Sequence, residues 1–244
     1  MSTAPAPVPH GGARRRLLRV TLGTIASLLL AAILLMLLVD RIFFAHTSTS
    51  AGTGSGVAST QARSASRFTA VDLAGFNNVV VRAGAKQSVV VHADSNLLTR
   101  VTTRVRAGRL VIGTTPGNLA AKSPMYVVVT LPSVEALTLR GAGNITVSNL
   151  DSRRLTVRLP GAGMIRATGR AARLDVTISG SGTALLGQLV ARDVKAGVSG
   201  DGSIMLTATR SLTATISGSG AILYGGNPAQ VTTRVTGDGT ITPG

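Results

Sequence analysis

The pattern that decides the fold is contained in the stretch LDVTISGSGTALL, residues 174–186. Apolar and polar residues alternate from Leu174 to Ile178, which is the period of a strand with one buried face. Gly180-Ser-Gly182 then interrupts the alternation, and a second apolar segment follows it. The stretch therefore predicts two short strands that are joined by a glycine turn.

The same glycine triplet occurs six times at a nearly constant spacing. The first glycines of successive triplets are 20, 19, 20, 18 and 19 residues apart. One such triplet carries little information, whereas six with one period indicate a repeat architecture. The predicted structural glycine corners are Gly141, Gly143, Gly161, Gly163, Gly180, Gly182, Gly200, Gly202, Gly218, Gly220, Gly237 and Gly239.

Stacking is what the repeat requires, because one unit cannot bury its own apolar face. Stacked units place corresponding strands in parallel, about 4.8 Å apart, and glycine lets the stacked corners approach closely. A β-propeller would need blades of about 40 residues or more. We therefore predict an all-β fold, a parallel β-helix or solenoid of about six coils of ~19 residues, beginning with an irregular β portion.

Residues 67–244 are assigned to this head domain, although residues 68–131 do not follow the repeat. Their Val-rich runs are expected to form the irregular β portion and to cap the N-terminal end of the stack. The last triplet is followed by few residues, so we expect the final coil to be an exposed edge. Exposed edges pair, and a homo-oligomer through this C-terminal end is one expected partner.

An uncharged apolar segment, VTLGTIASLLLAAILLMLLV, occupies residues 20–39. Its length suits one transmembrane helix, and the arginines before it favour a cytoplasmic N-terminus. We predict a basic cytoplasmic tail at 1–19, a signal-anchor helix at 20–39 in the inner or plasma membrane, and a Ser/Thr/Gly linker at 40–66. The head domain would then be periplasmic or extracellular. A cleaved signal peptide is the alternative, but its apolar stretch is usually shorter.

No catalytic, metal-binding or cofactor-binding constellation is recognisable, and we predict a protein that is not an enzyme and needs no cofactor. Cysteine is absent, which excludes disulfides and thiolate metal sites. Asp201 and Asp238 lie within glycine corners, where turn propensity explains them better than a calcium repeat. An enzyme that acts on acidic polysaccharide is the alternative, and Asp175 and Asp193 on adjacent coils are its candidate carboxylates.

The net charge of +16 favours anionic partners, although a solvated basic surface is equally compatible with it. Each of four arginines lies one or two residues before the first strand of its coil. Stacking would place these residues in one column, where like charges repel unless an anion neutralises them. The candidate anionic-ligand edge consists of Arg154, Arg173, Arg192 and Arg210. A solvated turn, offset by nearby aspartates, is the alternative interpretation, and nucleic acid is disfavoured because only 2% of the residues are aromatic.

The order of several motifs resembles the GIN head-domain family, which is named for autotransporter adhesin heads. The motifs are FNNVVVR (76–82), VHADSNLL (91–98), RLVI (109–112), LPSVEAL (131–137) and the Gly-Ser-Gly-like corners, and together they span residues 68–243. The resemblance implies a β-solenoid and provides no catalytic residues. We therefore expect a membrane-anchored, non-catalytic binding or adhesion-like module of the cell envelope, with anionic envelope polymers as ligands. A structural or signalling ectodomain is a further alternative.

Overall fold

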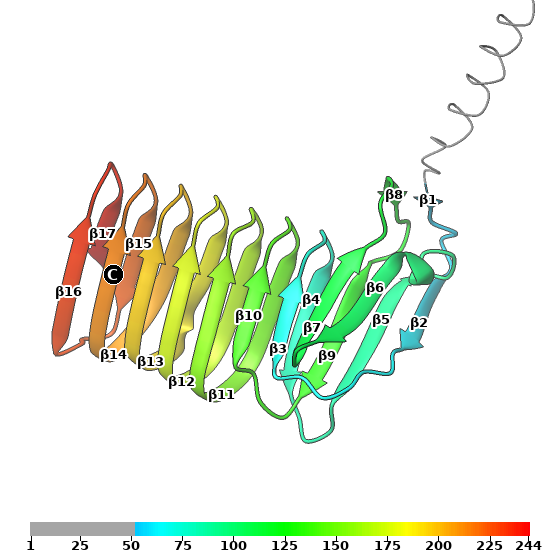
Figure 1. Cartoon of the computed structure of the whole chain (residues 1–244), viewed down its shortest axis with the longest axis horizontal. Helices are drawn as coiled ribbons and strands as arrows, with labels where there is room; N and C mark the ends of the chain where they lie inside the picture. The colour runs from blue at the N-terminus through cyan, green and yellow to red at the C-terminus, as the bar shows by residue number, and fades with distance from the viewer. Residues whose placement is uncertain (1–51) are drawn as a thin grey trace, which may run out of the picture. The chain divides into compact units, whose positions relative to one another are not determined.

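The glycine-corner repeat winds into a β-solenoid in the computed structural model, which describes residues 52–244 (Figure 1). Layer A contains the strand segments that follow the corners, and layer B contains those that precede them. The strands of the regular coils are β10 (Ala136–Leu139), β11 (Asn144–Leu159), β12 (Met164–Ile178), β13 (Thr183–Val198), β14 (Ser203–Ile216), β15 (Ala221–Gly225), β16 (Gln230–Val235) and β17 (Thr240–Pro243). Each of β11 to β14 runs from layer A into layer B.

The pairing register stacks equivalent residues of successive coils. In layer A, Ile145 pairs with Ile165, which pairs with Ala184. In layer B, Leu155 pairs with Leu174, and both side chains are buried. All of these ladders are parallel, which confirms the predicted parallel solenoid. The six corners enclose about five full turns rather than six, because the prediction counted corners and not the coils between them.

The corners stack so tightly that a side chain has no room there. A Cβ atom on Gly161 would lie 2.6 Å from the carbonyl oxygen of Arg140 and even closer to that of Gly141. The same clash with the preceding corner recurs at Gly180 and Gly200. Of the twelve corner glycines, only Gly237 has a positive φ, so close approach of stacked backbones, and not backbone conformation, is the main reason for glycine.

We expect Gly161→Ala to destabilise the domain by roughly 1 to 3 kcal/mol, because the methyl group must displace backbone atoms of the coil below. Gly197→Ala is the matched control, since nothing lies within 4 Å of a Cβ there. It should be neutral or stabilise by about 0.5 kcal/mol, as alanine replaces glycine within a strand. Urea unfolding of both variants tests this contrast, and equal effects would contradict it.

One further corner precedes the six that the sequence analysis identified. A Cβ atom on Gly141 would collide with the carbonyl group of Gly75, which lies between β3 (Ala70–Leu73) and β4 (Asn78–Ala83). These strands pair in parallel with β10 and β11. The expectation that residues 68–131 lie outside the repeat is therefore wrong for β3 and β4. Their corner contains Phe76 and Asn77 in place of the Gly-x-Gly triplet, which is why periodicity alone did not identify it.

The irregular β portion lies between this first coil and β10, and it is largely antiparallel. Strand β9 pairs in parallel with β4 and antiparallel with β5, while β6 pairs antiparallel with β7. Its elements are β5 (Ser88–Asp94), the 3-10 helix η1 (Leu98–Arg100), β6 (Val101–Arg106), β7 (Arg109–Thr114), β8 (Leu119–Ala120) and β9 (Tyr126–Leu131). These strands share the hydrophobic core of the solenoid, and they form its N-terminal end.

Part of the predicted linker is ordered against this end. Strand β2 (Ala58–Ala62) pairs antiparallel with β5, and β1 (Gly52–Thr53) pairs with β8. Buried Asp94 accepts hydrogen bonds from the backbone nitrogens of Gly56 and Lys122, both at 2.8 Å. Burial alone would raise the pKa of Asp94. Hydrogen bonds from the backbone of Lys122, Ser123 and Gly56 and from the Ser123 hydroxyl group outweigh burial and lower this pKa. Strands β1 and β2 of the predicted linker segment are therefore paired with the head domain.

The predicted tail (1–19), membrane span (20–39) and first part of the linker lie outside the residues that the structure describes. Within residues 52–244, no helix has the length and apolar character needed to cross a membrane.

The last coil leaves its inward side chains exposed. Val235 on β16 stacks on Ile216, yet it is 43% exposed, whereas Ile216 is fully buried. Val231, in the same strand, is 44% exposed. Strand β17 pairs with β15 alone among the described strands. The expected exposed edge is therefore present, while self-association through it stays a prediction.

We expect Val198→Ala to cost about 2 kcal/mol, because it removes buried carbons and leaves a cavity. Val235→Ala removes the same atoms from the same column two coils further on, where the side chain is half exposed. It should cost less than half as much. Thermal unfolding of both variants measures this difference, and a large loss at Val235 would mean that the end is covered in solution.

Candidate functional site

The four predicted arginines do not form one column. Arg154 pairs with Arg173 in register, but the next positions are occupied by Asp193 and Ser211. The register shifts between β13 and β14, at Leu186/Val190 and again at Ala191/Asp193. An earlier shift, between β12 and β13 at Arg166/Gly169, already places Asp193 and not Arg192 opposite Arg173. Arg192 and Arg210 therefore each lie one residue before the row that Arg154 begins. The continuous four-arginine column is therefore wrong, and the arginines form two pairs with different surroundings.

One pair is held by a carboxylate. Arg210 donates from Nε and Nη2 to the two oxygens of Asp193, both at 2.6 Å. Ser211 Oγ donates to Asp193 Oδ1 at 2.8 Å, and Arg192 Nε lies 3.6 Å from Oδ2. The hydrogen bonds from Arg210 and then Ser211 lower the pKa of Asp193 to about 2. For this pair, the alternative that an aspartate offsets the charge agrees with the structure, although Arg192 and Arg210 lie within β13 and β14 and not in a turn.

This arrangement makes stability depend on pH in the acid range. Because the folded-state pKa of Asp193 is about 2 and its usual value is 3.8, its contribution is complete above pH 4 and is lost as the pH falls towards 2. The difference in melting temperature between wild type and Asp193→Asn should therefore shrink over that interval. Arg210→Gln should reduce the same pH dependence, since it removes the main cause. A difference that persists at pH 2 would contradict this assignment.

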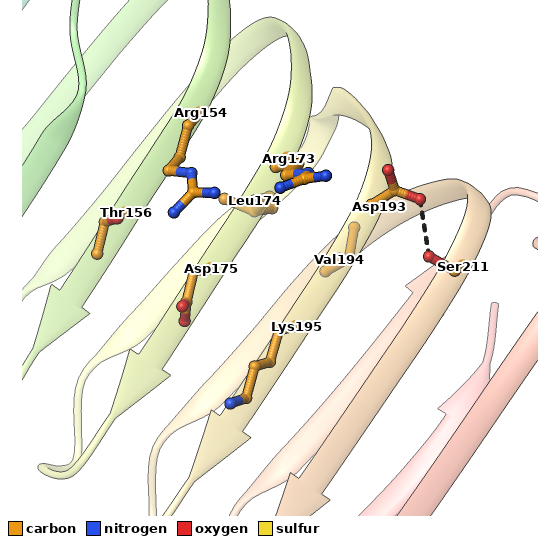
Figure 2. Close-up of a pocket in the computed structure, with 9 residues that line it drawn as sticks. All are labelled: Arg154, Thr156, Arg173, Leu174, Asp175, Asp193, Val194, Lys195 and Ser211. Carbon is orange, nitrogen blue, oxygen red and sulfur yellow. Dashed lines mark hydrogen bonds between the residues drawn. The ribbon is translucent and has the colours of Figure 1, made fainter.

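The other pair lies beside an open hollow on the outer side of layer B. The hollow has a volume of about 240 Å³, and Figure 2 shows the guanidinium groups of Arg154 and Arg173 projecting over it from adjacent coils. We call this site the arginine groove. Its lining residues are Arg154, Thr156, Arg173, Leu174, Asp175, Asp193, Val194, Lys195 and Ser211.

The charges in the arginine groove are not balanced. Among residues 52–244, no carboxylate lies within ion-pair distance of Arg154 or Arg173. Asp193 is engaged by Arg210, and Asp175 pairs in register with Lys195 across the coils. Two adjacent guanidinium groups with free donors match the geometry of a carboxylate, phosphate or sulfate oxygen pair. The groove is therefore suited to bind an anionic group.

The two candidate catalytic carboxylates, Asp175 and Asp193, do line the same hollow. Hydrolysis of a glycosidic bond by a carboxyl pair requires that one member be protonated and act as the general acid. Asp193 is unsuited to the role of acid because its hydrogen bonds stabilise the ionised form, and it is unsuited to the role of base or nucleophile because Arg210 engages both of its oxygens. The geometry thus supports binding better than hydrolysis.

The histidine of the head domain and the two aspartates of the glycine corners do not line the groove. His92 stacks on Tyr126 with ring centroids 4.3 Å apart. Asp201 and Asp238 are exposed at corners. Within the described part of the chain, no three histidine, aspartate or glutamate side chains gather as a metal site would require.

Sequence reasoning missed that Thr156 and Lys195 belong to the groove. Thr156 lies two residues beyond Arg154, and Lys195 lies two residues beyond Asp193, each on the outward face of its strand. The outward positions of alternating strands are the signal that could have identified them, since residues i and i+2 share one face.

Comparison with known proteins agrees with this architecture. Residues 67–228 match the family described as "Putative auto-transporter adhesin, head GIN domain". The chain belongs to this family. The match covers more than half of the sequence, and it includes the arginine groove of this GIN domain and the first five glycine corners. None of the curated proteins matches the sequence.

Several solved structures share the fold of this GIN domain. A "putative adhesin" from Bacteroides fragilis is 21% identical, with a TM-score of 0.66 over 78% of this chain and 99% of that one. A "putative adhesin" from Parabacteroides distasonis is 20% identical, with a TM-score of 0.53 over 80% of this chain and 100% of that one. A "putative lipid binding protein" from the same species is 20% identical, with a TM-score of 0.51 over 79% and 98%. At these identities, the comparison establishes the fold alone.

Proposed function

We propose that this GIN domain is a non-catalytic, adhesion-like binding module of the cell envelope that recognises anionic groups through the arginine groove. The observation that carries the proposal is the pair Arg154 and Arg173, which stack in register without a carboxylate partner within residues 52–244. Holding two like charges side by side costs free energy. A bound anion offsets that cost, which gives the site a preference for anionic ligands.

The location at the envelope rests on the sequence. Residues 20–39 contain no charged residue and follow four arginines, which supports a single membrane span with the head domain outside the cytoplasm. The head domain would then face anionic envelope polymers and lipid head groups. Nucleic acid fits less well, because no aromatic side chain lines the groove to stack on bases.

A binding role is also favoured over the alternative of polysaccharide hydrolysis. The groove presents the two guanidinium groups of Arg154 and Arg173, which no carboxylate of residues 52–244 engages, whereas Asp193 is committed to Arg210. Proteins of the same fold are described as adhesins in two of the comparisons above. A structural or signalling ectodomain remains the better description if the groove binds no anion.

Replacing both Arg154 and Arg173 by serine should weaken binding to an anionic envelope glycan or anionic vesicles by at least tenfold, since each charge-assisted contact contributes about 1.5 to 3 kcal/mol. The measurement is a binding titration at low and near-physiological salt. Arg82→Ser with Arg166→Ser is the matched control, because these two exposed arginines lie in layer A and do not line the groove. If both double variants lose binding equally, general charge attraction explains the result and the groove has no special role.

A further inference from the structure

A second cluster of arginines lies on the outer face of layer B, and nothing in the repeat pattern predicted it. Arg109 comes from β7, Arg140 directly follows β10, and Arg158 lies on β11. They line a hollow of about 330 Å³, which we call the triple-arginine pocket. Its other lining residues are Thr138, Leu159, Pro160, Thr177 and Ser179.

A buried carboxylate anchors this cluster. Asp72 on β3 is fully buried, and Arg140 donates from Nη2 to its Oδ2. Arg109 reaches across to Thr138, with 3.1 Å between its Nη1 and the threonine Oγ1. These contacts hold two guanidinium groups in place. The other oxygen of Asp72 has no hydrogen-bond partner. Asp72 therefore forms an ion pair with Arg140 but with neither of the other two arginines.

The triple-arginine pocket therefore has an excess of positive charge. Its three guanidinium groups are matched by one carboxylate, and within residues 52–244 neither Arg109 nor Arg158 has an acidic side chain within ion-pair distance. The hydroxyl groups of Thr177 and Ser179 border the same space. Guanidinium and hydroxyl donors around a hollow are suited to oxyanions such as carboxylate, sulfate or phosphate.

The pocket and the arginine groove lie on one continuous surface. Arg154, Thr156 and Arg158 are alternate residues of β11, so their side chains emerge on the same outward face. At about 3.3 Å per residue, the first and last of them are roughly 13 Å apart along the strand. Thr156 lines the arginine groove, and Arg158 lines the triple-arginine pocket.

We infer that the triple-arginine pocket is a second anion subsite, and that the ligand is an acidic polysaccharide long enough to occupy this pocket and the arginine groove together. The inference rests on the proposed function for the groove, and it specifies the class of ligand. When one anionic group of a linear polymer binds the arginine groove, the next groups of the same polymer are held close to the triple-arginine pocket. Their local concentration at the pocket is therefore high, and binding at both subsites raises the overall affinity.

The surroundings of the two subsites favour a hydroxyl-bearing polymer over the alternatives. Thr156 and Thr177 lie beside the cations, and their hydroxyl groups can hydrogen-bond to sugar hydroxyls. No aromatic side chain lines either hollow, which disfavours the base stacking that single-stranded nucleic acid uses. The exposed large apolar residues of the described chain, such as Met164 and Met205, line neither hollow. Neither subsite therefore has an exposed large apolar side chain that could insert into a bilayer.

The test compares polygalacturonate with monomeric galacturonate, using the full chain and, in parallel, the unit of residues 51–244. Dextran sulfate replaces the carboxylates by sulfates, while single-stranded DNA and anionic phospholipid vesicles represent the other ligand classes. Arg158→Ser removes an exposed cation from the second subsite, and Arg173→Ser removes one from the first. Arg166→Ser is the matched control, because it removes an exposed charge from layer A.

For the long polymer, we expect Arg158→Ser and Arg173→Ser each to weaken binding about tenfold, with Arg166→Ser within twofold of wild type. The affinity of the arginine groove for monomeric galacturonate should not change in Arg158→Ser. Arg158→Lys should restore only part of the polymer affinity, because it keeps the charge without the planar fork of donors. Circular dichroism and thermal unfolding verify that each variant is folded.

The outcomes separate this inference from the proposed function. If Arg173→Ser weakens polymer binding while Arg158→Ser does not, the groove binds anions but the second subsite is wrong. If neither variant has an effect, both ideas fail. Equal losses with Arg166→Ser would show attraction by overall charge only, and tighter binding to DNA or vesicles than to either polysaccharide would overturn the ligand class.

Discussion

The close contact between stacked glycine corners is the constraint on which the rest of this structure depends. At each corner, the Cα atom of one coil lies against the carbonyl oxygen of the coil below, and the space that a Cβ atom would need is already occupied. This contact sets the distance between coils at one edge of the solenoid. The parallel ladders of both layers can then form with equivalent residues in register.

That register decides which face of each strand is buried. Leu, Ile, Val and Ala alternate inward over β11 to β14 and fill the space between the layers, where they form one continuous core. Because aromatic residues are rare, this core is built from small aliphatic side chains, and its tight packing depends on stacking like residues on like. The outward positions carry no such packing requirement, so they are free to vary and to bear charge.

The outward surface of layer B shows how a small irregularity redistributes function. A shift in register between β12 and β13 places Asp193 opposite Arg173, where an arginine was expected, and Arg210 on the next coil donates hydrogen bonds to that carboxylate. The upstream coils have no such acid in the equivalent position, so Arg154 and Arg173 remain available. Membership of the GIN family accounts for the solenoid itself, whereas the chemistry of the groove belongs to the outward side chains of this chain.

The sequence by itself determined the all-β class, the solenoid, the corner glycines and the inward side chains, because these depend on a local period that repeats along the chain. It also identified Arg154 and Arg173 as neighbours, since one regular repeat separates them. Only the tertiary structure decided that Gly75 begins the corner stack, that β2 belongs to the folded unit, and that Arg210 engages Asp193. It alone assembled Arg109, Arg140 and Arg158 above Asp72. These features depend on a long insertion between β4 and β10 and on shifts of register, and neither the pairing partner of a strand across such an insertion nor a one-residue slip is encoded in the period of the repeat.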